Sequence, residues 1–453
     1  SAAADTNFFD SVSITYPRKF AADANKISFF TQNYRGAVID GFTSANVRLF
    51  DVTDRANPIS VRNLAIEPQG STFRVILPPA PRGRVFFGLD DSMLLSPVSV
   101  TANNPDLIAT SGHAANLVIL SYKDFLTQAE AWAAYRRSQG ASVKVIELSE
   151  IFDEFSYGTF NSTSIREFLR YAVQNWQTPP GYVLLIGDAS YDARNYEGLG
   201  RFNLMPSRQV PTVYLETASD EWFGDFDGDG LSELAIGRVP ARTSEVVTTM
   251  LNKAMTFESG LNNPLSRGAL FAHDLPIGYN FEAMTQRLLS QLPNTTPTSV
   301  VGRGQANATA NLIAEINTGK YLVNYSGHGA TGTWASNDFF NVTMVPQLAN
   351  TSNPSIFTML TCLNGFFHSP IFDSFAEVLA KANNGGAVAS WASTGETTPD
   401  VQEFMAQRFF NRIGSGDITR LGDLIKDAKT QVHGGTDVRL SWVLIGDPML
   451  KVK

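Results

Sequence analysis

The chain has 453 residues, enough for two or three domains. Hydrophobic residues make up 43% and charged residues only 17%, a composition that excludes a disordered chain and suits an exported protein rich in strands and loops. The formal net charge is −8 and no basic run occurs, so we expect no nucleic-acid partner. No apolar stretch is long enough for a transmembrane segment.

The first segment, residues 1–105, is predicted to be a β-sandwich domain. Short stretches alternate apolar and polar residues, with Gly, Pro and Asn between them, as is typical of an all-β sandwich. The predicted strands cover 12–16, 47–52, 72–77, 84–88 and 98–101.

From about residue 115 the pattern changes to apolar strands that alternate with helices. This alternation predicts mostly parallel sheets covered on both faces. Strands are expected at 117–122, 143–148, 182–188, 233–237, 268–272, 321–325, 355–360, 387–391 and 442–445. We expect two consecutive sheets that divide this part into an α/β subdomain at 106–260 and a second at 261–453.

The one cysteine, Cys362, rules out a disulfide within the chain and a cysteine-based zinc site. A lone cysteine is more often a buried apolar residue than a nucleophile, so its neighbours must decide. Cys362 follows one apolar strand and His328 follows another, and each has a glycine nearby. Reactive groups gather at the carboxyl ends of such strands, and an imidazole beside a thiol activates it as a nucleophile. In this hypothesis the amides of Gly329 and Cys362 form an oxyanion hole.

Four separated motifs resemble those of the gingipain family of cysteine peptidases. They are Tyr-Ser-Gly-His-Gly at 325–329 followed by Trp334, Thr-Cys-Leu-Asn-Gly-Phe at 361–366, Gly-Arg at 237–238, and Trp-Val-Leu-Ile-Gly-Asp-Pro at 442–448. The resemblance implies a caspase-like fold for the catalytic subdomain. It also implies a secreted or cell-surface endopeptidase that acts on proteins or peptides, with Cys362 as nucleophile and His328 as general base and acid, and that needs no cofactor for its chemistry.

The resemblance also implies a third catalytic residue and a substrate pocket. Asp274 lies at the matching place for an acid that orients His328. The position that is acidic in arginine-specific members falls near Gly278 here, which puts a preference for basic residues in doubt. Glu282, Trp391 and Glu396 are the other candidates for the pocket.

An acidic loop at 225–233 is a candidate for structural calcium. Asp225, Asp227, Asp229 and Glu233 supply oxygen ligands around turn glycines, although the spacing departs from an EF-hand at its end. An ordinary acidic turn is the alternative.

Two other functions stay open. The segment at 15–18, Thr-Tyr-Pro-Arg, resembles the sortase branch of the same family, whose members trim and attach cargo in type IX secretion. An amine would then take the acyl group, and the secretion machinery would supply partners. The second alternative is a surface binding protein built on an inactive peptidase scaffold.

Overall fold

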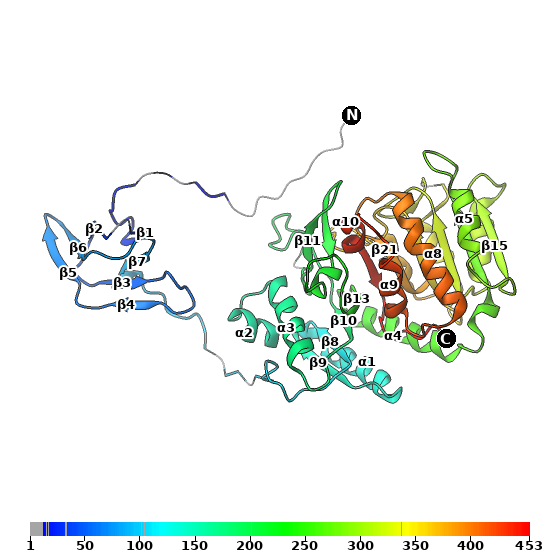
Figure 1. Ribbon diagram of the computed structural model, residues 1–453, viewed down its shortest axis with the longest axis horizontal. Coiled ribbons are helices and arrows are strands. Elements are labelled where there is room, and N and C mark those ends of the chain that lie inside the picture. Colours follow the sequence, from blue (N-terminus) through cyan, green and yellow to red (C-terminus); the bar gives the residue numbers. More distant parts are fainter. Residues whose placement is uncertain are drawn as a thin grey trace. The chain divides into compact units, whose positions relative to one another are not determined.

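The structure is a computed structural model that describes residues 12–14, 16, 18–31, 34–100, 102–103, 105–200, 202–336 and 338–453 (Figure 1). The chain forms two compact units, residues 1–104 and 105–453, and each is described by itself. The part of the chain described contains no helix long and apolar enough to cross a membrane.

The N-terminal unit consists of two antiparallel sheets, as the sequence predicts. One sheet has the strand order β1-β7-β3-β4 and the other β2-β6-β5. The strands are β1 (Lys26–Phe30), β2 (Ala37–Phe42), β3 (Val47–Asp51), β4 (Ile59–Val61), β5 (Ala65–Gln69), β6 (Thr72–Leu77) and β7 (Val85–Asp90). Alternate residues such as Ile27, Phe29, Leu49 and Val75 point inward and form one shared core. Residues 12–14, 16 and 98–100 form no strand, and Thr15, Pro17 and Thr101 lie outside the described residues.

In the second unit, ten of the described strands form a single sheet rather than the two that we expected. Their order is β15-β14-β16-β20-β21-β22-β13-β10-β8-β9. They are β8 (Leu117–Ser121), β9 (Val143–Glu147), β10 (Tyr182–Ile186), β13 (Ala235–Val239), β14 (Ala269–His273), β15 (Thr298–Gly302), β16 (Leu322–Ser326), β20 (Ser355–Leu360), β21 (Ala387–Ser393) and β22 (Trp442–Ile445). The last strand, β22, joins the two halves, because it pairs antiparallel with β21 and parallel with β13. The other neighbouring strands of this sheet run parallel.

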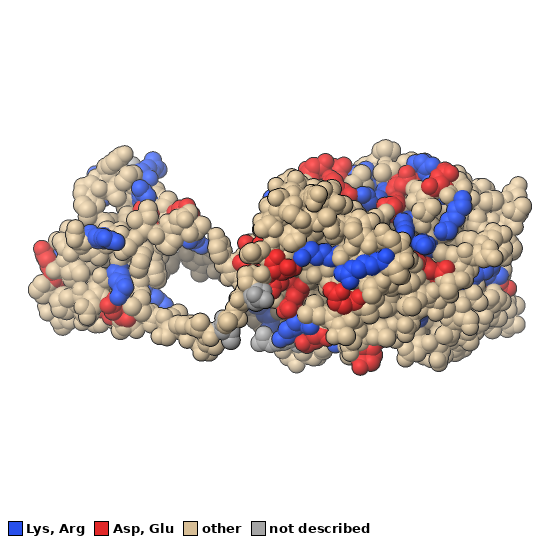
Figure 2. All heavy atoms as spheres, turned by 90° about the horizontal axis from the view of Figure 1, so that it is seen from below, with Lys and Arg blue, Asp and Glu red and all other residues tan. Residues whose placement is uncertain are grey.

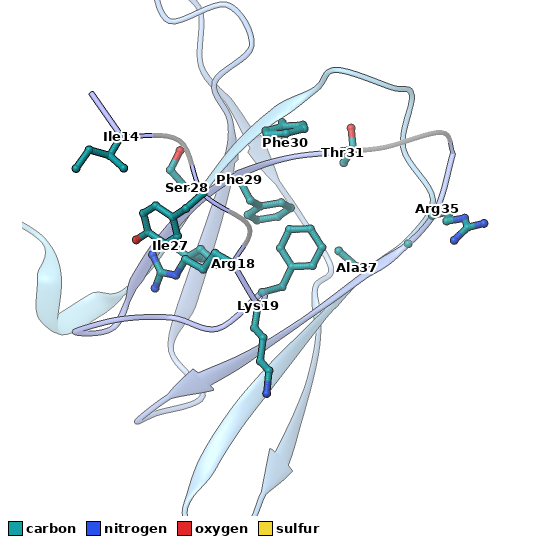
Figure 3. Close-up of a pocket in the computed structure, with 13 residues that line it drawn as sticks. Ile14, Arg18, Lys19, Ile27, Ser28, Phe29, Phe30, Thr31, Arg35 and Ala37 are labelled. Carbon is teal, nitrogen blue, oxygen red and sulfur yellow. The ribbon is translucent and has the colours of Figure 1, made fainter. Parts of the chain in front are cut away.

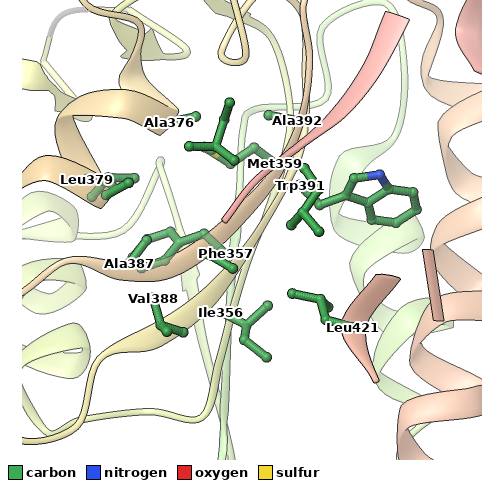
Figure 4. Packing of buried hydrophobic residues seen from close by; sticks show 14 of the residues in the cluster. Ile356, Phe357, Met359, Ala376, Leu379, Ala387, Val388, Trp391, Ala392 and Leu421 are labelled. Carbon is green, nitrogen blue, oxygen red and sulfur yellow. The ribbon is translucent and has the colours of Figure 1, made fainter. Parts of the chain in front are cut away.

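Helices cover both faces of this sheet. They are α1 (Leu126–Ser138), α2 (Leu148–Ser156), α3 (Ser162–Asn175), α4 (Ser244–Ser259), α5 (Phe281–Leu289), α6 (Ala308–Asn317), α7 (Phe375–Lys381), α8 (Pro399–Ser415), α9 (Leu421–Lys429) and α10 (Thr436–Ser441). Figure 4 shows Trp391 and Leu421 on one side of β20 and β21, and Ala376 and Leu379 of α7 on the other. The strands read as continuous apolar runs because both of their faces are buried.

Short elements complete the unit. The hairpin strands are β11 (Arg208–Pro211) with β12 (Glu216–Ser219), and β17 (Gly329–Ala330), β18 (Thr333–Trp334) and β19 (Phe340–Asn341).

On the face of the molecule that Figure 2 presents, basic and acidic side chains are interspersed rather than gathered into patches of one sign.

Candidate active site

The carboxyl ends of neighbouring parallel strands bring the predicted catalytic residues to one edge of the sheet. In the register, His273 of β14 lies beside Ser326 of β16, and Ser326 lies beside Leu360 of β20. Asp274 is therefore one residue past this row, and His328 and Cys362 are each two residues past it. The next strand, β21, ends at Ser393 and leads into Glu396 and Thr397. Four adjacent strands thus deliver the candidate groups to the edge where α/β sheets place their chemistry.

The His328 imidazole is fixed by a main-chain carbonyl. Its Nε2 lies 2.8 Å from the carbonyl oxygen of Ile277, and the ring of Phe281 meets it edge-on at 5.2 Å. The carbonyl of His328 accepts a hydrogen bond from the Tyr325 hydroxyl at 2.6 Å, and Tyr325 stacks on Trp334. Both the ring and the backbone of His328 are therefore held in place.

The glycines on either side of His328 are required by space. A Cβ at Gly327 would lie 2.3 Å from the Tyr325 hydroxyl oxygen and 2.6 Å from Cβ of Asp274. A Cβ at Gly329 would lie 2.4 Å from Oγ1 of Thr361. The two glycines of the Ser-Gly-His-Gly motif are therefore needed because the loop after β16 packs closely against the loops after β14 and β20.

The Cys362 thiol, which follows β20, is partly buried and lies against the segment that follows β21. Its Sγ donates to the Thr397 carbonyl at 3.5 Å. Burial raises the pKa of the Cys362 thiol, the Thr397 hydrogen bond lowers it, and the charge of Glu396 raises it, with a net increase. The raised pKa and the hydrogen bond that sulfur donates to the Thr397 carbonyl both favour a neutral thiol. The structure gives no hydrogen bond between the His328 ring and this thiol, both of which belong to its described part.

The backbone around Cys362 leaves an amide free. Leu363 has a left-handed φ of 61°, and its N–H donates to the Gly395 carbonyl at 3.1 Å. The neighbouring amide of Cys362 has no acceptor among the described residues. A strained residue and an unused donor beside a nucleophile are features of catalytic loops.

Gly329 lies in the hairpin after His328, where it pairs with Trp334. The adjoining hydrogen bond of this hairpin is donated by the Ala335 N–H to the His328 carbonyl. The role of the Gly329 amide as the second oxyanion donor stays a prediction.

Asp274 lies beside His328 but binds its backbone rather than its ring. Its Oδ2 accepts from the His328 N–H at 3.4 Å, and its Oδ1 accepts from the Leu275 N–H at 2.7 Å. The guanidinium of Arg303 pairs with the same carboxylate at 3.1 Å.

Three residues near the site had no role assigned from the sequence, although each supplies a polar anchor. Asn364 belongs to the cysteine motif, and its Nδ2 donates to the Ala330 carbonyl at 2.6 Å and the Thr333 carbonyl at 3.2 Å, tying the cysteine loop to the hairpin after His328. The anchors at Ile277 and Thr397 are main-chain carbonyls, which no side-chain motif reveals.

The four residues predicted for a substrate pocket lie in different surroundings. Trp391 is 1% exposed and stacks on Phe409 in the core, so the prediction that it lines a pocket is wrong: β21 is covered on both faces. Gly278 follows Ile277 in an open turn, and Glu282 is exposed in the first turn of α5. Glu396 is exposed and acts electrostatically on Cys362.

In the acidic loop, oxygens of Asp225, Asp227 and Asp229 lie within 4.8 Å of one another. Asp225 is buried and accepts from the amides of Gly228 and Gly230. Glu233 does not belong to this group, since its carboxylate accepts from the Phe226 N–H.

A cavity of about 680 Å³ lies in the N-terminal unit and contains none of the predicted catalytic residues. It opens beside β1, and Figure 3 shows Arg18, Lys19 and Phe29 among its lining residues. Because none of the candidate catalytic residues lines it, we do not assign the active site to this cavity.

The curated proteins that this chain resembles in sequence include gingipains. Gingipain R2 of Porphyromonas gingivalis is 23% identical over 363 residues, which cover 74% of this chain and 46% of the relative. Gingipain R1 of the same organism is 24% identical over 318 residues, covering 64% of this chain and 30% of the relative. The chain therefore spans less than half the length of these two relatives.

Solved structures show the same fold. The crystal structure of the Arg-specific cysteine proteinase gingipain R matches with a TM-score of 0.64 at 20% identity, covering 78% of this chain and 80% of that one. Dimeric latent PorU from Porphyromonas gingivalis matches with a TM-score of 0.52 at 16% identity, covering 95% of this chain and 39% of that one. The model of peptidase family C25 matches residues 110–453, so this chain belongs to peptidase family C25.

Proposed function

We propose that the chain is a secreted or cell-surface cysteine endopeptidase that cleaves peptide bonds through an acyl-thioester on Cys362. The observation that carries this proposal is the strand register, which sets His328 and Cys362 each two residues beyond paired residues of adjacent parallel strands. Membership of family C25 supports the same reaction class. The substrates proposed are proteins or peptides, and the chemistry needs no cofactor.

The reaction follows from the groups present. Nδ1 of His328 takes the proton from Sγ as sulfur attacks the substrate carbonyl carbon, and the carbonyl oxygen becomes an oxyanion. The amides of Cys362 and Gly329 donate to this oxyanion. As the C–N bond breaks, His328 gives its proton to the departing amine. The acyl group then remains on Cys362 as a thioester. His328 then deprotonates a water molecule, which attacks the thioester carbonyl carbon. The C–S bond breaks, the carboxylic acid product is released, and His328 returns the proton to Sγ.

Replacing either reacting side chain tests the proposal. We expect Cys362→Ala and His328→Ala to lower kcat/KM on a quenched peptide library by at least about 10³-fold, because each removes a reacting group. His433→Ala is the matched control, since His433 is exposed. Full cleavage by Cys362→Ala would refute the proposal.

A second candidate reaction is transfer of the acyl group to an amine, as in a sortase-type transpeptidase with secretion-machinery partners. It rests on the segment at 15–18, which resembles the sortase branch of the family, and the fold match to PorU extends over 95% of this chain, against 78% for gingipain R. Mass spectrometry of digests with added glycine amide distinguishes the reactions: amide-capped products support transfer, and products with free carboxylates alone support hydrolysis.

We also propose structural calcium at Asp225, Asp227 and Asp229. Each of these carboxylates offers an oxygen within 4.8 Å of the others, a cation between them would offset their mutual repulsion, and hard oxygen ligands suit Ca²⁺. Calcium should therefore raise the Tm of the wild type over that in EGTA, and this increase should vanish in Asp227→Asn. An equal Tm in calcium and EGTA would exclude the site.

A further inference from the structure

We propose that the main-chain carbonyl of Ile277, rather than the carboxylate of Asp274, orients the catalytic imidazole and sets its tautomer. The inference rests on the catalytic role of His328 proposed above. It makes Ile277 a positioning residue and gives Asp274 a different task from the one that the sequence suggests.

The hydrogen bond at Nε2 determines where the ring proton lies. A carbonyl oxygen has no proton to give, so the 2.8 Å contact with Ile277 requires Nε2 to be the donor. A neutral imidazole carries one N–H, and Nδ1 therefore keeps its lone pair. The base that accepts the thiol proton is thus Nδ1, and the imidazolium formed in the reaction keeps its Nε2–H bond to the carbonyl.

The Asp274 carboxylate is committed to other donors. Oδ1 accepts from the Leu275 N–H and from Arg303, and Oδ2 accepts from the His328 backbone N–H. Asp274 is 2% exposed, and the structure gives it no hydrogen bond to the His328 ring, which it describes in full. Arg303 also offsets its negative charge, which weakens any effect of this carboxylate on an imidazolium.

Asp274 instead builds the loop that presents the carbonyl. It caps the Leu275 N–H, and the Ile277 N–H donates to the Leu275 carbonyl at 2.7 Å, forming a tight turn. Gly278 then takes a φ of 73°, which redirects the chain toward α5, whose Phe281 contacts the His328 ring. One carboxylate thus supports both this turn and the backbone of His328.

An ester in place of the Ile277–Gly278 peptide bond tests the carbonyl directly. Glycolic acid in place of Gly278 makes the Ile277 carbonyl a poorer acceptor, and the Gly278 N–H that is lost donates to no acceptor among the described residues. We expect kcat to fall by about three- to tenfold with little change in KM, the effect of weakening one hydrogen bond. The same ester at Gly434, which is exposed and surrounded by open space, is the control.

The tautomer gives a readout independent of activity. The chain has five histidines, so ¹⁵N spectra of the rings can be assigned with His328→Ala. We expect His328 to carry its proton on Nε2 in the wild type and in Asp274→Asn, and to lose part of this preference in the Gly278 ester. A proton on Nδ1 in the wild type would overturn the inference.

Asp274→Asn separates the two possible orienting groups. We expect at most about a tenfold loss of kcat/KM, whereas loss of a carboxylate that holds a catalytic histidine's tautomer costs about 10⁴-fold. A loss above 10³-fold at unchanged Tm, or an ester without effect while His328→Ala is inactive, would overturn the inference. If His328→Ala stays active, the proposed function fails instead, and the tautomer spectra still decide the role of Ile277.

Discussion

At the scale of single residues, the site is shaped by the absence of side chains as much as by their presence. His328 lies between two glycines whose missing Cβ atoms make room for Tyr325, Asp274 and Thr361. Small displacements here matter, because the imidazole and the thiol come from separate loops that must meet within hydrogen-bonding reach for proton transfer.

Gly329→Ala should therefore impair catalysis. The added Cβ would lie 2.4 Å from Oγ1 of Thr361 and 2.9 Å from the Thr333 carbonyl, so the hairpin or the cysteine loop must move. We expect kcat/KM to fall about 10- to 100-fold and stability by about 1–3 kcal/mol, measured by peptide cleavage and urea unfolding. Gly332→Ala, whose Cβ would meet only Val342 at 3.3 Å, is the control. Equal activity of the two variants would contradict this packing argument.

His368 should make the stability of the fold depend on pH. Its burial, helped by the charge of Arg238, lowers the pKa of His368 from 6.5 to about 3, so the folded chain keeps this ring neutral. Between these two values the unfolded chain binds a proton that the folded chain does not. The free energy of unfolding should fall as pH drops from 6.5 toward 3, by up to about 1.4 kcal/mol per pH unit.

Urea unfolding at several pH values measures this effect against His368→Gln, which cannot titrate. We expect the wild type to lose more stability than the variant between pH 7 and pH 4. Parallel pH profiles for the two proteins would assign the acid sensitivity to other groups.

At the scale of elements, α7 connects the two catalytic loops. The Phe375 N–H donates to the Thr331 carbonyl at 2.8 Å, and the Ala376 N–H donates to the Asn364 carbonyl at 2.9 Å. A buried capping box formed by Ser374 and Glu377 begins this helix. The first turn of α7 is thus hydrogen-bonded to both loops.

The Asn364 side chain supplies the second connection, and Asn364→Ala should break it. The partly buried hydrogen bonds to the carbonyls of Ala330 and Thr333 would be lost, which costs about 0.5–1.5 kcal/mol each. We expect kcat/KM to fall at least about tenfold, because the loops that carry His328 and Cys362 are no longer tied. The comparison is Asn411→Ala, an exposed position on α8. A variant with lower Tm and full activity would show that Asn364 serves folding alone.

The sequence predicted most of these elements and the strand ends that carry the site, because apolar strands that run into glycine-rich turns are a local signal. Its failures have physical causes. The direction of Trp391 could not be predicted, since β21 is buried on both faces and its sequence does not alternate. The carbonyl of Ile277 is a main-chain group that only the folded loop aims at His328.

At the scale of the whole second unit, the joint between the two halves is the feature that the sequence did not predict. The pairing of β22 with β13 links residues about 200 positions apart, as the register pair Arg238–Ile445 shows, and no local pattern signals it. The boundary proposed near 260 lies between α4 and β14, while the strands on its two sides share one sheet.

Gly237 makes this joint possible, and Gly237→Ala should weaken the unit as a whole. A Cβ there would lie 2.2 Å from the Gly446 carbonyl and 2.9 Å from Cδ of Pro448, so β13 and the chain after β22 would have to separate. The next residue, Arg238, is fully buried, pairs with Asp220 at 2.7 Å and lies over the ring of Phe367 in the cysteine loop. Disturbing the joint therefore reaches the active site.

We expect Gly237→Ala to lower the free energy of unfolding by about 1–3 kcal/mol or more, and to reduce peptide cleavage at temperatures where the control is stable. Gly181→Ala is the matched control, because it lies just before β10 in the same sheet and its Cβ would meet open space. Urea unfolding followed by tryptophan fluorescence should show one transition for residues 105–453 that shifts as a whole, since a single sheet crosses both halves. Two separate transitions would mean that β22 does not couple the halves, if the substitution shifted only the transition of the half that contains β13.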